Sequence, residues 1–148
     1  MKIAVVCANG KEGKLVTKEA LDRGFDVTAV VRGENRSEAK KAIVKDLFDL
    51  TKEDLEGFDA VVDACGAWMA ETVGTIPDAV KKLCTLLAGT DTRLLIVGGA
   101  GSLYVNKEHT LTVADGEDFP DAFKPLAELP FMATENIMME CVKAGGDR

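Results

Sequence analysis

Two glycines lie in a short turn where the lack of a side chain would permit phosphate binding. The turn spans residues 7–13, between an apolar run at residues 3–7 and a segment of helical periodicity. Gly10 would let the backbone approach a phosphate, and Gly13 would let the helix pack closely on the strand. The first turn of a helix also presents N–H groups without acceptors and a partial positive charge. The spacing therefore predicts a pyrophosphate site formed by Asn9, Gly10, Lys11, Glu12 and Gly13.

The turn resembles the G-x-x-G-x-x-G phosphate loop of extended and atypical short-chain dehydrogenases, with Cys7 in place of the first glycine. Either Cys7 keeps a negative φ, or the geometry of the turn differs from that of the family. A thiol at a helix N-terminus can have a lowered pKa and act as a redox sensor. We favour the simpler interpretation, in which Cys7 is a small buried residue that replaces glycine. A tight strand–helix turn that binds no ligand is the alternative for the whole motif.

Two arginines follow the second apolar run. An NAD site usually has an acidic residue about 20 positions after the glycine loop, where it binds the ribose 2′-hydroxyl. Arg32 stands there in this chain, and Arg36 lies four residues further on. Two guanidinium groups can bind a 2′-phosphate, so the pattern favours NADP(H) over NAD(H). The alternative is a pair of solvated arginines on a loop.

These side chains need a scaffold, and the apolar pattern predicts one. Strand-like runs alternate with helical segments along the chain, which predicts a parallel sheet with right-handed crossovers. We expect one α/β domain over residues 1–148, a doubly wound Rossmann fold of about five strands in order 3-2-1-4-5. The expected strands lie at residues 3–7, 26–31, 43–45, 60–64 and 93–97. The expected helices lie at residues 13–23, within 34–42, at 51–57, 75–88 and 131–143.

Composition excludes several classes of protein. The net charge of −7 argues against a nucleic-acid partner, because modules that bind duplexes usually carry a basic face. We expect no such partner. The apolar runs are far shorter than the ~20 residues of a membrane span, and the N-terminus carries no signal-peptide pattern. Four cysteines without a C-x-x-C pair and a single histidine predict no metal site. We expect free thiols, and hence a cytoplasmic location.

Several stretches are similar to one known family. Residues 30–32, 45–50, 59–66 and 93–105 resemble the NAD(P)H-binding, NmrA-like atypical short-chain dehydrogenases, more narrowly those related to NADH-flavin reductases and biliverdin IXβ reductase. The resemblance covers essentially the whole chain and is most specific at residues 98–105 and 118–125. It implies that Asp46 and Leu47 border the adenine. It also implies that the nicotinamide ribose passes over Ala64, Cys65 and Gly66, and that Gly98 to Tyr104 line the nicotinamide and substrate pocket.

Family members run to about 200 residues or more. This chain stops directly after the helix expected before a sixth strand, so we expect the C-terminal part of the fold to be missing.

The tyrosine–lysine pair of many short-chain dehydrogenases is incomplete. Their motif is Tyr-x-x-x-Lys, whereas Tyr104 is the sole tyrosine here and Lys107 follows it by three residues. A flavin or quinone can accept hydride directly when it is held against the nicotinamide, so positioning can suffice. Ser102 and Tyr104 are then the candidate catalytic residues, as hydrogen-bonding partners of the acceptor; simple loop structure is the alternative.

We therefore expect an NAD(P)H-dependent oxidoreductase whose partner is a small-molecule acceptor, with FMN or FAD as a candidate substrate. The alternative is a non-catalytic NADP(H)-sensing module of the NmrA-like type. The sequence does not determine the oligomeric state.

Overall fold

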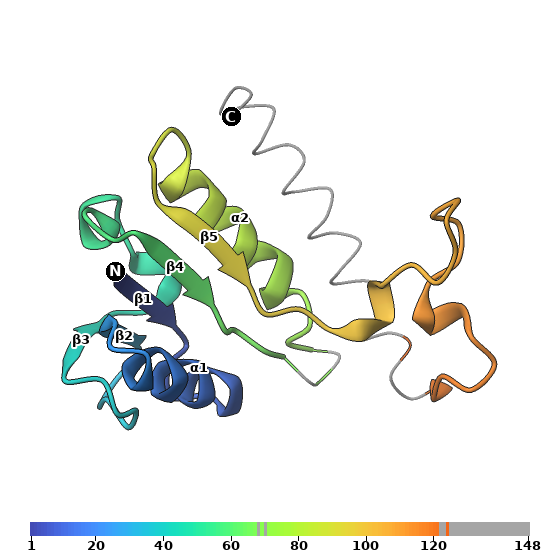
Figure 1. The fold of residues 1–148 in the computed structure, drawn as a ribbon, viewed down its shortest axis with the longest axis horizontal. Coiled ribbons are helices and arrows are strands. Elements are labelled where there is room, and N and C mark those ends of the chain that lie inside the picture. Colours follow the sequence, from blue (N-terminus) through green and yellow to red (C-terminus); the bar gives the residue numbers. More distant parts are fainter. Residues whose placement is uncertain (68, 70, 122–123, 125–148) are drawn as a thin grey trace.

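A five-stranded parallel sheet forms the centre of the molecule (Figure 1). The computed structural model describes residues 1–67, 69, 71–121 and 124. The strand order is β3-β2-β1-β4-β5, and all four neighbouring pairs are parallel. The expected fold and strand order are therefore confirmed. The strands are β1 (Lys2–Val6), β2 (Asp26–Val31), β3 (Lys41–Val44), β4 (Ala60–Asp63) and β5 (Arg93–Ile96).

Two helices cover opposite faces of the sheet. Helix α1 (Lys11–Asp22) packs on β1 and β2, and helix α2 (Thr75–Leu87) packs beside β5 (Figure 1). Short 3-10 turns complete the described part of the chain. They are η1 (Leu47–Asp49), η2 (Glu53–Leu55), η3 (Ala100–Ser102) and η4 (Val113–Asp115).

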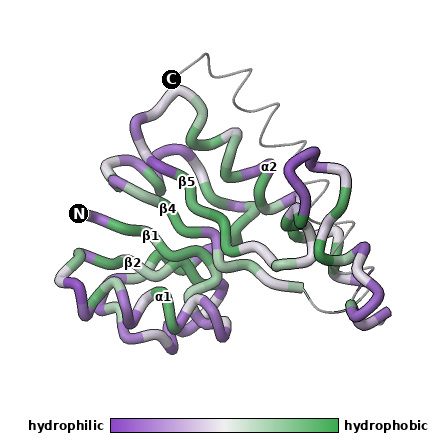
Figure 2. Tube along the Cα trace, turned by 45° about the vertical axis from the view of Figure 1, so that its right-hand side comes forward, coloured by the Kyte–Doolittle hydropathy of each residue, from purple (hydrophilic) through white to green (hydrophobic). Residues whose placement is uncertain are grey.

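The alternation of side chains along β1 explains why this strand is apolar without interruption. Ile3 and Val5 belong to the cluster that packs under α1, while Ala4 and Val6 belong to the cluster that packs under α2. A strand covered on both faces needs apolar residues at every position. Figure 2 shows the resulting hydrophobic colouring along the central strands, with hydrophilic residues gathered on the outer loops.

Helix α1 begins two residues earlier than expected. It starts at Lys11, and its buried residues are Gly13, Thr17 and Ala20, whereas Leu15 is 63% exposed. Gly13 can occupy its buried position only because it has no side chain. A Cβ atom at Gly13 would lie 2.3 Å from the carbonyl oxygen of Cys7 and 2.7 Å from the Cα atom of Ala8. The helix packs so closely on the preceding turn that its smallest residue must face the sheet.

The helix expected within residues 34–42 does not form. Its place is taken by a turn in which the Asn35 side chain replaces helical hydrogen bonds. The Ser37 N–H donates to Asn35 Oδ1 at 3.0 Å, and Asn35 Nδ2 donates to the Ala39 carbonyl at 2.8 Å. Such side-chain bonds to the backbone compete with helix formation. The expected helix at residues 131–143 lies outside the described residues.

The described residues contain no helix long and apolar enough to cross a membrane. They also contain no group of three or more His, Cys, Asp or Glu side chains that could hold a metal ion.

The packing at Gly13 predicts the effect of adding one methyl group. Gly13→Ala should lower the free energy of unfolding by about 2–3 kcal/mol, because backbone atoms of the turn cannot move aside cheaply. Gly74→Ala is the matched control, since a Cβ there meets no atom within 4 Å and should change stability by less than about 1 kcal/mol. Urea unfolding of both variants measures the difference, and equal stabilities would contradict the steric argument.

Candidate functional site

A cleft of about 570 Å³ opens at the carboxyl ends of β1, β2 and β4. Strand β1 lies between the other two, and the strand order reverses its direction there: β2 and β3 follow on one side, β4 and β5 on the other. Open α/β sheets bind ligands at such a switch point. The volume falls within the range of small-molecule sites. The lining residues are Val6, Cys7, Asn9, Gly10, Val30, Val31, Arg32, Gly33, Glu34, Arg36, Lys45, Leu47, Ala64 and Gly66.

The turn after β1 contains a residue in the left-handed conformation. Cys7 has a φ of 60°, in the region that usually requires glycine, so the alternative in which Cys7 keeps a negative φ is wrong. The Gly10 N–H donates to the Cys7 carbonyl at 2.9 Å, and the first helical bond runs from the Lys14 N–H to the Gly10 carbonyl. The amides between these residues have no acceptor within the helix. They are the N–H groups that a phosphate would need.

Asn9 has a role that the sequence did not reveal. Its side-chain amide bonds to the loop after β2: Asn9 Nδ2 donates to the Glu34 carbonyl at 2.9 Å, and Asn9 Oδ1 accepts from the Arg36 N–H at 2.7 Å. The glycine turn and the arginine loop are therefore joined across the cleft entrance. A local pattern could not have shown this, because the partners lie 25 and 27 residues away.

Positive charge gathers on the side of the cleft formed by β2 and β3. Arg32 and Arg36 are exposed and line the cleft together with Lys45. Lys45 is paired with Asp54 at 2.7 Å, and Glu34 adds one carboxylate to the lining. The two arginines thus bring cationic groups to the cleft beside the open helix terminus, as an anionic ligand requires.

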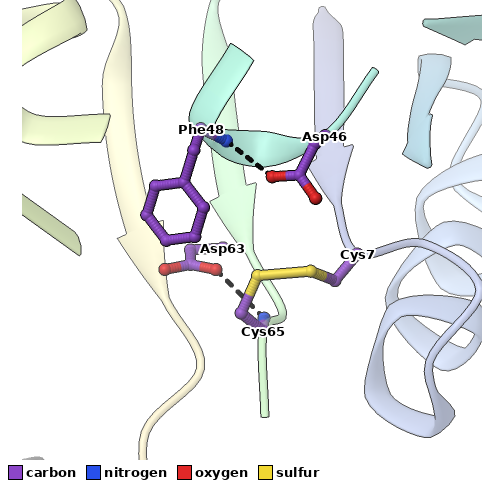
Figure 3. Close-up of a disulfide and its surroundings, with 5 residues drawn as sticks. All are labelled: Cys7, Asp46, Phe48, Asp63 and Cys65. Atoms are coloured by element: carbon purple, nitrogen blue, oxygen red, sulfur yellow. Dashed lines mark hydrogen bonds between the residues drawn. A yellow bond between two sulfur atoms is a disulfide. The ribbon is translucent and has the colours of Figure 1, made fainter. Parts of the chain in front are cut away.

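The remaining residues of the expected cofactor site divide into two groups. Leu47, Ala64 and Gly66 line the cleft with Asn9, Gly10 and the two arginines. Lys11 and Glu12 are exposed on the first turn of α1, and Gly13 is buried. None of the three is among the lining residues. The Asp46 carboxylate accepts from the Phe48 N–H at 2.9 Å and caps η1 (Figure 3).

Cys65 is bonded to Cys7, so the expectation that all the cysteines are free thiols is wrong. This disulfide joins residues 58 positions apart, with Cα atoms 5.3 Å from each other (Figure 3). The pairing of the strands explains the disulfide, because the carboxyl ends of β1 and β4 are neighbours in the sheet. Cys7 directly follows β1, and Cys65 lies two residues beyond the end of β4. A cytoplasmic location stays a prediction, and cysteine usage no longer supports it.

Two residues expected at the nicotinamide and acceptor pocket, Gly98 and Tyr104, do not line the cleft. Gly98 is exposed beyond the end of β5, and the Ser102 side chain lies outside the described residues. Tyr104 pairs with Thr112 in an isolated antiparallel bridge and stacks on His109, with ring centroids 4.7 Å apart. Neither Gly98 nor Tyr104 is among the residues that line the cleft.

A buried carboxyl group lies beside the disulfide. Asp63 ends β4, is 2% exposed, and accepts from the Cys65 N–H at 3.0 Å (Figure 3). Burial raises the pKa of Asp63 to about 6, and the bond from the Cys65 amide lowers it only in part. The sequence signal for this group is an acidic residue at the end of an apolar strand, and it was missed.

The sequence profile of the NAD(P)H-binding family matches residues 7–128, which include the glycine turn, both arginines and strands β2 to β5, and begin directly after β1. The chain belongs to the NAD(P)H-binding family. The uncharacterized family relative YwnB of Bacillus subtilis (strain 168) is 40% identical over 129 residues. That alignment covers 86% of this chain and 61% of YwnB, so the chain spans about three fifths of its relative.

Two solved structures extend the comparison. SP1627 from Streptococcus pneumoniae TIGR4, a proposed NADH-flavin reductase, is 48% identical with a TM-score of 0.89, over 95% of this chain and 67% of SP1627. A Burkholderia pseudomallei protein that is proposed to be exported is 33% identical with a TM-score of 0.75, over 95% of this chain and 65% of that protein. This member of the NAD(P)H-binding family therefore shares its fold with an NADH-flavin reductase-like structure, as its sequence predicted.

The raised pKa of Asp63 predicts how stability depends on pH. The folded state holds the proton more strongly than the unfolded state, so stability is lost as the pH rises from about 4 to about 6. Asp63→Asn removes the buried charge and keeps an acceptor for the Cys65 amide. The gain from this substitution should therefore grow from near zero at about pH 4 to about 3 kcal/mol at about pH 7.

Urea unfolding of the wild type and Asp63→Asn across this pH range measures the effect. Asp118→Asn, at an exposed carboxylate, controls for the loss of one negative charge. A gain from Asp63→Asn that did not change with pH would contradict the assignment.

Proposed function

We propose that the cleft binds NADP(H) and that the chain is the cofactor-binding part of an NAD(P)H-dependent oxidoreductase that reduces a flavin or a related small acceptor. One observation carries this proposal: Asn9 and Gly10, which directly precede α1, line the same cleft at the carboxyl edge of the sheet as Arg32 and Arg36. The first feature suits a pyrophosphate and the second suits a 2′-phosphate.

The residues present fit a dinucleotide. A Cβ at Gly10 would come within 3.2 Å of the Cys7 carbonyl oxygen, so this position favours a bare backbone that a phosphate can approach. Asn9, Gly10 and the following amides would hold the pyrophosphate, and Arg32 with Arg36 would hold the 2′-phosphate. Leu47 would contact the adenine, with Asp46 beside it. The nicotinamide ribose would lie over Ala64, Cys65 and Gly66.

The chain would contribute binding and orientation. A bound reduced nicotinamide supplies the hydride equivalent that the acceptor takes up. The arginines neutralise phosphate charge, and the glycine turn fixes the dinucleotide at the edge of β1 and β4. Ser102 and Tyr104 stay our candidate catalytic residues toward FMN, FAD or another small acceptor. The name of SP1627 supports a flavin as this acceptor.

Binding without turnover is the second candidate, a module that senses NADP(H). Tyr104, the sole tyrosine of the chain, stacks on His109 and does not line the cleft, which favours this reading over tyrosine-dependent chemistry.

A turnover assay separates the two candidates. Mixing the protein with NADPH and FMN, riboflavin or a quinone should oxidise NADPH faster than the same mixture without protein, followed by the absorbance of the reduced nicotinamide. Calorimetric binding of NADPH without any such acceleration would support the sensing module. Absence of both binding and turnover would contradict the proposal.

Arg32 predicts the choice of cofactor. A hydrogen bond to a charged group contributes about 1.5–3 kcal/mol, so Arg32→Ala should weaken NADPH binding by roughly ten- to a hundredfold. NADH binding should barely change, because NADH carries no 2′-phosphate. High salt should reduce the difference, since the arginine is exposed.

Calorimetric titration of the wild type and the variant with both cofactors measures these effects. Arg93→Ala is the matched control, because Arg93 begins β5 at the opposite, amino-terminal edge of the sheet. Equal losses for NADPH and NADH would mean that Arg32 supports the fold or the adenine. A wild type that prefers NADH would overturn the assignment of NADP(H).

A further inference from the structure

The disulfide lies next to the cleft. Cys7 is a lining residue, and Cys65 stands between Ala64 and Gly66, which also line the cleft. The bond therefore joins the glycine turn after β1 to the loop after β4 at the position proposed for the pyrophosphate and the adjoining ribose. A purely structural crosslink has no need of this location, because β1 and β4 are already paired through four residue positions.

Both partners of the disulfide are connected to backbone groups that shape the cleft. The Cys7 carbonyl accepts from the Gly10 N–H, and Gly10 is the N-cap residue that directly precedes α1. The Cys65 N–H donates to the buried Asp63 carboxyl group at 3.0 Å. A backbone shift at either cysteine would therefore displace a segment that a bound dinucleotide would contact.

We propose that Cys7 and Cys65 form a reversible dithiol–disulfide pair that sets the affinity of the cleft, and that the disulfide form binds the dinucleotide more tightly. This inference rests on the proposed function, because it takes the cleft to be the dinucleotide site.

Size gives the first reason for the direction of the effect. Bonded sulfur atoms are about 2 Å apart. Two thiol sulfurs, like other non-bonded heavy atoms, need about 3.5–4 Å. Reduction must therefore separate the side chains of Cys7 and Cys65. Cys7 already lines the cleft, and Ala8 behind it is fully buried, so the space that its sulfur gains lies toward the ligand.

Order gives the second reason. The disulfide holds the glycine turn and the loop after β4 together before any ligand arrives. Without it, the ligand must order both segments itself, and that ordering reduces affinity. Both arguments give the same direction. By thermodynamic reciprocity, a bound dinucleotide then protects the disulfide against reduction by the same factor.

The redox step is an ordinary thiol–disulfide exchange. A thiolate of dithiothreitol attacks one sulfur of the disulfide, the bond between Cys7 and Cys65 breaks, and a mixed disulfide forms. The second thiol of dithiothreitol then releases the protein as a dithiol and closes to the cyclic disulfide. Two electrons and two protons pass from the reagent to the cysteines. Oxidised glutathione reverses the exchange. Both cysteines are partly exposed at an open cleft, which gives small thiols access.

The test compares NADP⁺ binding to the two forms of the wild-type protein. The oxidised cofactor is the probe because it is not itself a reductant. One sample is treated with oxidised glutathione and the other with dithiothreitol, and the reagents are removed without air before calorimetric titration. Thiol counting verifies the state of each sample. We expect the disulfide form to bind NADP⁺ about five- to tenfold more tightly.

Each other outcome has a distinct meaning. Equal affinity of the two forms would overturn this inference and leave the proposed function intact, whereas no binding by either form would overturn both. A thiol count that dithiothreitol does not raise would show that the disulfide is not reversible. Loss of the circular dichroism signal of the fold on reduction would show a structural disulfide. Either result would overturn the inference.

Variants locate the effect. Cys7→Ser and Cys65→Ser should each abolish the difference between the oxidising and reducing treatments. Cys7→Gly should do the same while it preserves the left-handed turn, since glycine adopts a φ of 60° freely. Cys84→Ala is the matched control at a buried cysteine of α2 outside the disulfide, and it should keep the difference. A redox response that survives in Cys65→Ser would exclude this pair as its source.

Discussion

The close approach of α1 to the turn before it is the constraint on which the site depends. Gly13 has no space for a side chain, because the Cys7 carbonyl and the Ala8 backbone occupy that position. This contact sets where the helix begins and directs its first amides to the carboxyl edge of the sheet. A helix held further from β1 would leave the same amides away from the cleft, and the arginines after β2 would then line a pocket without a phosphate-binding terminus.

The sequence contained enough information for the scaffold and for much of the cleft. Uninterrupted apolar strands such as β1 are typical of a sheet covered on both faces, and the alternation with helices determines the parallel order. Gly10 and Arg32 were predicted because each lies in the loop that follows a strand, and all strands of a parallel sheet end at the same edge. Their positions follow from local patterns, which a single sequence displays.

The features that sequence reasoning missed depend on partners far apart along the chain. Asn9 is expected at the pyrophosphate as part of the glycine turn, and the sequence did not show that its side chain also bonds to the backbone of Glu34 and Arg36. The disulfide joins two loops whose closeness follows only from the pairing of β1 with β4. The burial of Asp63 similarly arises from packing against other segments. The helix expected within residues 34–42 failed for a local reason, since helical periodicity gives no weight to the side-chain bonds of Asn35.

The two hydrogen bonds of Asn9 also fix a distance. They connect the glycine turn to the backbone of Glu34 and Arg36 in the loop after β2. The loop that carries the arginines and the turn before α1 are therefore held together. A ligand with two phosphate groups would therefore meet binding partners at a preset spacing. A ligand with a single phosphate would engage only one end of this arrangement. The spacing between the two phosphate-binding segments is then set by one amide side chain rather than by the groups that carry charge.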